Sequence, residues 1–260
     1  MPTKANYSKI TESPGLKATQ EQLDRLYQRY NFASNYSKNK KVLEIACGSG
    51  LGLKYLARMS KRVTGIDIDE INIDIARKAC ANFENISVKL MDAHEMSFAD
   101  ADYDLILLFE AIYYLSNPKK FVSEAHRLLS NQGMLIICSV NKNWKDFHPS
   151  PYSCYYYSIP ELRDLLKGKF DNIIFFGGFP VYQEGLKAKF FSLIKHTAIR
   201  LDLIPGSLAS RAVLKRLFVG KTLPIPETLY DGITSYENPK PLPDDRPTTD
   251  WKIIYAIAQK

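Results

Sequence analysis

Residues 41–52 have the sequence KVLEIACGSGLG, and this stretch decides the fold. A β-branched and apolar run over 42–45 is interrupted by Glu44, and Gly48 and Gly50 then break the extended pattern. Leucines at helical spacing follow the glycines. The pattern predicts a buried strand, a tight turn and a helix, with the glycines at the junction where backbone can approach a ligand closely. This junction is a candidate cofactor site.

Two nucleotide-binding motifs are excluded by the same residues. The dinucleotide fingerprint G-x-G-x-x-G fails because, counting from Gly48 and Gly50, its third glycine position is Leu53. The P-loop fails because no Gly-Lys-Ser or Gly-Lys-Thr follows. What remains is a loop suited to an adenosyl ligand without phosphates.

The ordered motifs resemble those of the class I S-adenosylmethionine-dependent methyltransferases. Their first motif is an acidic residue, any residue and G-x-G-x-G, which this chain matches with Glu44, Gly48 and Gly50 and with Ala46 in place of the first glycine. The similarity continues in order through residue 176, in the alternating strand and helix plan of such a domain. It implies S-adenosyl-L-methionine as cofactor and S-adenosyl-L-homocysteine as product. It also implies an α/β, Rossmann-like, doubly wound sheet of seven strands, ordered 3-2-1-4-5-7-6 with the last strand antiparallel.

The composition predicts one domain, because 260 residues with 45% hydrophobic and 24% charged residues are ordinary for a globular protein. Its predicted parts are an N-terminal lead and cap helix (1–36), a cofactor-binding core (37–176), an insertion that caps the substrate site (177–250) and a final strand (251–259).

Cysteine usage and charge narrow the compartment and the partners. The four cysteines are widely spaced, without a C-x-x-C pair or a histidine cluster, so neither a disulfide framework nor a metal site is predicted. No signal peptide opens the chain and no apolar run is long enough to span a bilayer, so a cytoplasmic protein is expected. The net charge of +7 favours anionic partners: a phosphorylated substrate, nucleic acid or a lipid surface.

An acidic residue ends the second predicted strand, which covers 62–68. Asp67 lies where a carboxylate can accept hydrogen bonds from both ribose hydroxyls, and the alternative is a solvated turn carboxylate. Asp69 is predicted to cap the helix that follows.

The third predicted strand, 86–90, leads into the sequence Met-Asp-Ala-His. The resemblance implies that Asp92 binds the adenine amino group, that the backbone of Ala93 binds a ring nitrogen, and that Ile68 packs on the adenine face. His94 is predicted to be an exposed or capping residue rather than a catalyst.

Residues 103–108 form a nearly continuous apolar run, as a central parallel strand buried on both faces should. Phe109 and Glu110 follow it, at the end of the strand that faces the crevice, and are expected close to the methionine part of the cofactor. Tyr113 and Tyr114 come next. They either shape the substrate pocket or pack as aromatic residues at the start of a helix.

A helix is predicted over 16–36, because apolar and aromatic residues recur along one face. In the family such a helix often covers the bound cofactor. Tyr30 on this helix is therefore predicted to contact the cofactor or the substrate, and aromatic packing in the core is the alternative.

The stretch 141–157 is rich in aromatic residues and contains two prolines, which predicts a loop over the mouth of the site that acts as a substrate lid. Trp144 and Tyr152 are its candidate substrate contacts. His148 is the candidate catalytic base, because the ordinary pKa of histidine suits proton removal near neutral pH.

Residues 186–221 carry many lysines and arginines interleaved with apolar residues. Three interpretations stay open. The segment contacts an anionic membrane surface, with the protein peripheral at the inner membrane surface, or it binds a phosphorylated carrier, or it packs as a helical cap with solvated lysines.

The predicted function is methyl transfer to an oxygen or nitrogen nucleophile of a small molecule, glycan or natural-product intermediate. The overall sequence resembles bacterial methyltransferases of polysaccharide or natural-product pathways. RNA methylation is an alternative. Only the net charge supports it, so nucleic acid is the less favoured partner. A module that binds the cofactor without turnover is a third.

Overall fold

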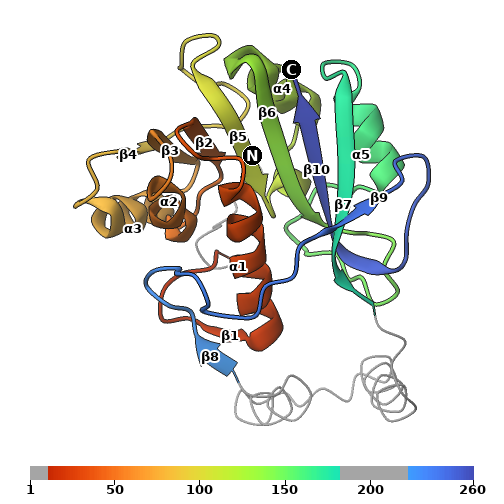
Figure 1. Ribbon diagram of the computed structural model, residues 1–260, viewed down its shortest axis with the longest axis horizontal. Helices are drawn as coiled ribbons and strands as arrows, with labels where there is room; N and C mark the ends of the chain where they lie inside the picture. The colour runs from red at the N-terminus through yellow and green to blue at the C-terminus, as the bar shows by residue number, and fades with distance from the viewer. Residues whose placement is uncertain (1–10, 182–221) are drawn as a thin grey trace.

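The computed structural model describes residues 11–181 and 222–260, which form a mixed sheet between two layers of helices (Figure 1). The eight strands of this sheet are ordered β4-β3-β2-β5-β6-β10-β7-β9. Their bounds are β2 (Lys41–Ile45), β3 (Arg62–Asp67), β4 (Ile86–Leu90), β5 (Tyr103–Phe109), β6 (Leu129–Val140), β7 (Asn172–Pro180), β9 (Lys240–Leu242) and β10 (Trp251–Gln259). The five neighbouring strands β4, β3, β2, β5 and β6 pair in parallel, and β10 runs antiparallel to both β6 and β7. The predicted seven-strand order is confirmed, and β9 adds an eighth strand at the edge.

Alternate residues of the central strands pack into two separate cores, one on each face of the sheet. Val42 and Leu105 belong to the first core, whereas their neighbours Leu43 and Ile106 belong to the second. The first core includes α1 (Gln20–Ser34), α2 (Leu51–Ala57) and α3 (Glu70–Cys80), and the second includes α4 (Pro118–Leu128) and α5 (Ile159–Leu166). The sheet is buried on both faces because every second side chain of a strand points the same way.

The helix predicted from residue 16 begins later, at Gln20, because the residues before it form a strand. Strand β1 (Lys17–Thr19) pairs antiparallel with β8 (Thr222–Pro224), and the two lie beside the start of α1 in Figure 1. Thr19 then caps α1 in a reciprocal pair of hydrogen bonds with Gln22. The predicted cap of α3 is confirmed, since the Asp69 side chain accepts from the backbone N–H groups of the first turn.

The insertion predicted between the sixth and seventh strands is present, but it begins after Pro180 and contributes the edge strand β9. Strand β7 continues to Pro180, and β9 pairs with it through Phe175–Gly177. The basic segment 186–221, for which membrane or carrier contact is predicted, lies outside the described residues. Within the described ranges, no helix is long and apolar enough to cross a bilayer.

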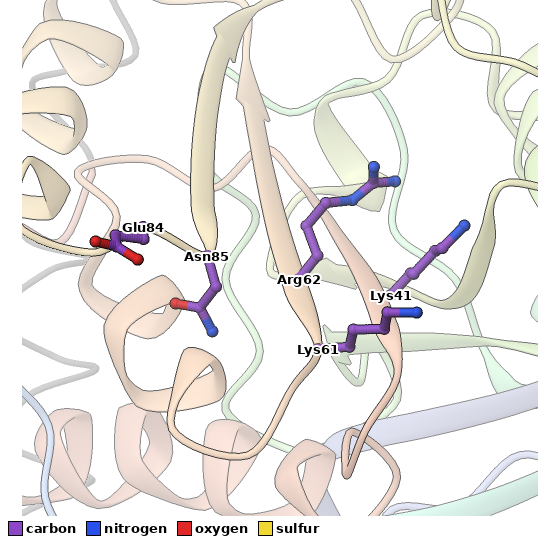
Figure 2. Close-up of a pocket in the computed structure, with 5 residues that line it drawn as sticks. All are labelled: Lys41, Lys61, Arg62, Glu84 and Asn85. Atoms are coloured by element: carbon purple, nitrogen blue, oxygen red, sulfur yellow. The ribbon is translucent and has the colours of Figure 1, made fainter.

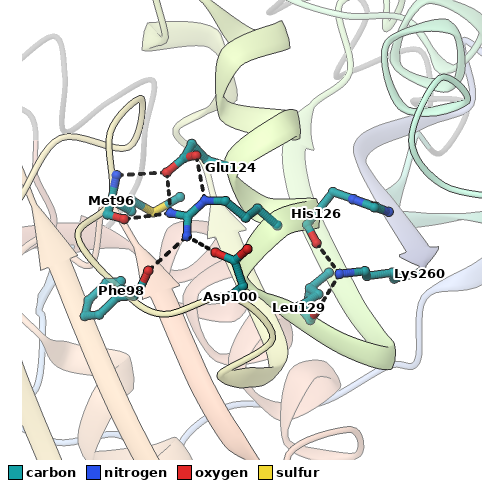
Figure 3. A network of polar contacts seen from close by, with 8 residues as sticks. Met96, Phe98, Asp100, Glu124, His126, Leu129 and Lys260 are labelled. Carbon is teal, nitrogen blue, oxygen red and sulfur yellow. Dashed lines mark hydrogen bonds and ion pairs between the residues drawn. The ribbon is translucent and has the colours of Figure 1, made fainter.

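The connection from β4 to β5 is fixed to α4 by one arginine (Figure 3). Arg127 donates to the backbone oxygens of Met96 (2.8 Å) and Phe98 (2.9 Å) and also contacts Glu124 and Asp100. Glu124 in turn accepts from the Met96 N–H at 3.0 Å. This connection begins with the segment that carries Asp92, so the network steadies one wall of the candidate site.

Candidate cofactor and acceptor site

A cavity of about 690 Å³ opens at the carboxyl ends of β2, β3 and β5, under α1. It brings together most of the predicted site residues from separate parts of the chain. The predicted residues that line it are Tyr30, Ala46, Gly48, Asp67, Ile68, Asp92, Ala93, Phe109, Glu110, Tyr113 and Tyr114. Glu44, Gly50, Trp144, His148 and Tyr152 do not line it.

A second, smaller hollow of about 370 Å³ lies at the opposite ends of the same strands. Lys41 and Arg62, the first residues of β2 and β3, line it with Lys61, and Figure 2 shows these three cationic side chains extending to one side. Asp102 pairs with two of them, with oxygens 3.0 Å from Lys41 Nζ and 2.7 Å from an Arg62 nitrogen. The hollow has no aromatic wall and lies away from the glycine turn, so the larger cavity is the candidate site.

The turn after β2 is left-handed at three positions. The φ angles are +57° at Ala46, +55° at Gly48 and +78° at Gly50, a region that alanine adopts only with strain. A Cβ atom on Gly50 would lie 2.9 Å from Cβ of Ala76 in α3, so this position also needs glycine for close packing. Gly50 thus shapes the turn from behind, while Ala46 and Gly48 face the cavity.

Asp67 joins the turn to the end of β3. Its Oδ2 accepts from the Gly48 N–H at 2.9 Å, and its Oδ1 accepts from the Asp69 N–H at 2.8 Å. Burial raises the pKa of Asp67, and these two hydrogen bonds oppose that effect. The Asn72 side chain is a third donor to this carboxylate, which keeps acceptor capacity for the ribose hydroxyls.

Asp92 is oriented by His94. Its Oδ1 accepts from the His94 N–H at 2.8 Å and lies 2.6 Å from His94 Nδ1. The Asn117 N–H donates to His94 Nε2 at 3.2 Å, which leaves the ring proton on Nδ1. Both ring nitrogens therefore hold the loop in place. Burial raises the pKa of Asp92, but the hydrogen bonds and charge of His94 outweigh it and lower the pKa overall.

Glu44 lies behind the cavity wall and is bound to Tyr30. The Tyr30 hydroxyl donates to Glu44 Oε1 at 2.5 Å, and Glu44 is 1% exposed. Its Oε2 has no hydrogen-bond partner among the described residues. Burial raises the pKa of Glu44 to about 7, although the Tyr30 hydrogen bond and the Arg29 charge oppose it. Tyr30 reaches the cavity with its ring, which packs edge-on against Phe109 at 5.4 Å.

Sequence reasoning missed two arginines and a glutamate that line the cavity. Arg25 and Arg29 lie one turn apart on α1, and Arg29 is paired with Glu12. The backbone oxygen of Glu12 accepts from the Ser49 hydroxyl at 2.8 Å, so residues 11–12 cross the glycine turn. The available signal was the spacing of two cations beside the apolar face of a helix expected to cover the cofactor.

It also missed the requirement for Gly52. A Cβ atom there would lie 1.8 Å from Cε1 of Tyr30, so the tyrosine ring lies directly over this residue. A glycine within a predicted helix signals such close approach, because it otherwise weakens the helix.

Glu110 lines the cavity directly after the end of β5. Its backbone is left-handed, with φ +51°, which is strained for a residue with a side chain. The Tyr113 hydroxyl donates to Glu110 Oε2 at 2.8 Å, and Cys138 Sγ lies 3.8 Å from Oε1. Burial raises the pKa of Glu110, opposed by the charge of Arg29 and the Tyr113 hydrogen bond. Tyr113 is itself stacked on Tyr156, with ring centroids 4.4 Å apart.

The predicted lid contributes little to the cavity. His148 is exposed, Tyr152 is 49% exposed, and the Trp144 ring lies 5.5 Å from Lys252 Nζ. Cys154, at the end of this loop, does line the cavity and donates its N–H to the Tyr113 oxygen at 2.7 Å. The role of His148 as a base stays a prediction that this geometry does not favour.

S-adenosylmethionine fits the arrangement. Asp67 can hold the ribose hydroxyls, and Ile68 and Asp92 flank the space left for the adenine. Arg29 lines the cavity beside Glu12, and its guanidinium can pair with the α-carboxylate of the cofactor. Glu12 then offers a carboxylate for the amino group.

Comparison with known proteins agrees with this fit. Residues 43–137 match the family model described as "Methyltransferase domain". The ubiquinone biosynthesis O-methyltransferase of Bartonella tribocorum is 30% identical over 108 residues, which cover 41% of this chain and 44% of that protein. The demethylmenaquinone methyltransferase of Tropheryma whipplei is 31% identical over 127 residues, which cover 49% of this chain and 53% of that protein. The chain thus spans about half the length of the curated relatives it matches.

Solved structures share the fold at low sequence identity. A SAM-dependent methyltransferase of Thermotoga maritima superimposes with a TM-score of 0.58 at 16% identity, covering 92% of both chains. The [4+2]-cyclase SpnF gives 0.57 at 16% identity, covering 96% of this chain and 84% of that one. These likenesses establish the fold alone. Residues 43–137 thus form a methyltransferase domain, and the strand order and the cavity fit those of a class I S-adenosylmethionine-dependent enzyme.

Proposed function

We propose that this protein transfers a methyl group to a hydroxyl oxygen of a flat, small-molecule acceptor, with Glu110 as the proton acceptor. The observation that carries the proposal is a half-buried carboxylate with a raised pKa that lines the cavity directly after Phe109. A carboxylate whose pKa is raised toward neutral is a better base than one at its ordinary value.

The chain's own residues supply alignment and proton removal. When bound, S-adenosylmethionine supplies a methyl group that is already activated on a sulfonium sulfur. Glu110 accepts the hydroxyl proton as the acceptor oxygen forms its bond to the methyl carbon and the carbon–sulfur bond breaks. Tyr113 holds Glu110 Oε2, and Oε1, which has only the weak contact with the Cys138 thiol at 3.8 Å, takes the proton. The strained backbone and the stacked tyrosines keep this carboxylate in one orientation.

The walls around Glu110 favour an aromatic acceptor. Tyr113 and Tyr114 line the cavity with ring centroids 4.6 Å apart, and flat rings pack well on such a surface. Two relatives named above belong, by their names, to ubiquinone biosynthesis and to demethylmenaquinone methylation. Within the natural-product or glycan acceptors predicted from the sequence, these features favour an aromatic natural-product intermediate with an oxygen nucleophile.

The test is methyl transfer from labelled S-adenosylmethionine to a panel of phenols, enols, amines, glycans and RNA, with product identified by mass spectrometry. Glu110→Gln should lower kcat by at least about 100-fold, the low end for general base catalysis. Its affinity for S-adenosylhomocysteine should be retained. His148→Ala is the competing variant and should leave kcat unchanged.

Methylation of amines or RNA but of no hydroxyl would overturn the proposal. So would a Glu110→Gln variant as active as wild type, or a loss confined to His148→Ala. A product that depends on RNA, with steep salt dependence, would establish the alternative instead.

A further inference from the structure

Two arginines line one cavity whose cofactor carries one carboxylate. Arg25 and Arg29 both reach the cavity from α1, and the Nε of each is buried without a hydrogen-bond partner among the residues that the structure describes. We propose that Arg25 recognises a carboxylate on the acceptor, so that the substrate is an aromatic hydroxy acid. The proposal rests on the proposed function and names the substrate class for the same site.

Arg29 belongs to the cofactor end of the cavity. It pairs with Glu12, whose backbone oxygen is bound to Ser49 in the turn after β2. Its guanidinium also lies 5.5 Å from the ring of Tyr30, the residue bound to Glu44. These contacts lead back to the glycine turn, and the charge of Arg29 also opposes the burial that raises the pKa of Glu110, at the border between the two ends.

Arg25 belongs to the acceptor end of the cavity. Its guanidinium lies 5.6 Å from the ring of Phe179 near the end of β7. In the sheet, β7 is separated from β2 by β5, β6 and β10, so Phe179 is on the far side of Glu110 from the glycine turn. An acceptor that meets Glu110 from this side therefore meets Arg25.

The charge around Arg25 is not neutralised locally. Glu21 pairs with Arg25, but its other carboxylate oxygen lies 2.8 Å from Lys252 Nζ, so one negative charge faces two cations. Glu21 and the Phe179 ring hold the guanidinium in place, and the side chain stays partly exposed where it lines the cavity. A planar carboxylate matches this pre-oriented, positively charged fork better than a neutral amide does.

An aromatic hydroxy acid satisfies both ends at once. Its carboxylate pairs with Arg25, its ring packs along Tyr113 and Tyr114, and its hydroxyl reaches Glu110. Replacing the carboxylate by an amide keeps the shape and removes only the charge.

The test pairs that chemical change with a change at Arg25. Calorimetry measures binding of 3,4-dihydroxybenzoate and of 3,4-dihydroxybenzamide to the protein loaded with S-adenosylhomocysteine. Wild type should bind the acid at least about tenfold more tightly, the effect of one charge-assisted hydrogen bond of about 1.5 kcal/mol. Arg25→Gln should abolish this preference, and Arg25→Lys should retain part of it. The matched control is Arg163→Gln, which removes an exposed arginine of α5 that pairs with Asp244. This variant should behave as wild type.

Equal binding of acid and amide by wild type would overturn the proposal, as would no binding of either, or an unchanged preference in Arg25→Gln. If Arg25→Gln fails to fold, the preference of Arg25→Lys for the acid over the amide is the deciding measurement, and a preference equal to that of wild type would overturn the proposal. The proposed function fails separately: acid-selective binding that depends on Arg25, without any methylated product, would refute hydroxyl methylation and leave the recognition by Arg25 intact.

Discussion

Burial of the Glu44 carboxyl makes the stability of the free protein depend on pH. The pKa of Glu44 is about 7 in the folded chain, against an ordinary value of 4.5. In the unfolded chain the group ionises near that ordinary value, so between the two values the folded state binds more protons. The contribution of Glu44 to the free energy of unfolding should therefore be highest below pH 4.5, fall as pH rises to 7, and level off above it.

The size of this effect follows from the same two values. A pKa difference of about 2.5 corresponds to about 3 kcal/mol, at about 1.4 kcal/mol for each pH unit. Glu44→Gln removes the ionisation but keeps an oxygen that accepts from the Tyr30 hydroxyl. The variant should thus gain about 3 kcal/mol relative to wild type between pH 4.5 and pH 7.5.

The assay is urea unfolding of both proteins without cofactor, at half-unit steps from pH 4.5 to 8. Taking the difference between variant and wild type cancels the other titrating groups. Glu84→Gln makes the same chemical change at an exposed position and should follow the wild-type curve. Curves for Glu44→Gln and wild type that stay parallel within 1 kcal/mol, in a measurement precise to a few tenths, would refute the reasoning.

Three further predictions test the cavity walls. Asp67→Ala should weaken S-adenosylhomocysteine binding at least about 100-fold by calorimetry, because two charge-assisted hydrogen bonds are lost; binding within tenfold of wild type would contradict the ribose assignment. Gly52→Ala should lose about 1–3 kcal/mol in urea unfolding, because its Cβ would overlap the Tyr30 ring, whereas Gly168→Ala, with no atom within 4 Å of the new Cβ, should not. Arg127→Met should speed hydrogen exchange across residues 91–102 and leave β2 unchanged; unchanged exchange in the connection would show that the network of Figure 3 does not hold it.

The strand order could be predicted because each strand carries its own local signal. The continuous apolar run over 103–108 indicated a central strand, and the glycine turn indicated where its neighbour ends. Strand β9 escaped because Pro241 lies within it and prolines flank it, a pattern that argues against regular structure. Proline is tolerated there because β9 is the outermost strand and only one side of it is paired.

The cofactor side of the cavity was also predictable, whereas the acceptor side was not. Asp67 and Asp92 come at the ends of strands, and their positions follow from the strand pattern. Arg25 faces the cavity because of the angle at which α1 packs over the sheet, and no local sequence pattern predicts that packing angle. His148 was chosen for its ordinary chemistry, while the pKa of Glu110 depends on burial that only the folded chain creates.

The position of β10 has a consequence for how the chain folds. Residues 251–259 fill the slot between β6 and β7, forming ladders with both strands along nearly their whole length. Until those residues have been synthesised, β6 and β7 each have an exposed edge, and exposed edges invite pairing with other chains. The pairing of β10 with β6 joins residues more than one hundred positions apart, a topology associated with slow folding. Deleting this strand should therefore produce an aggregating chain and not a smaller, stable domain.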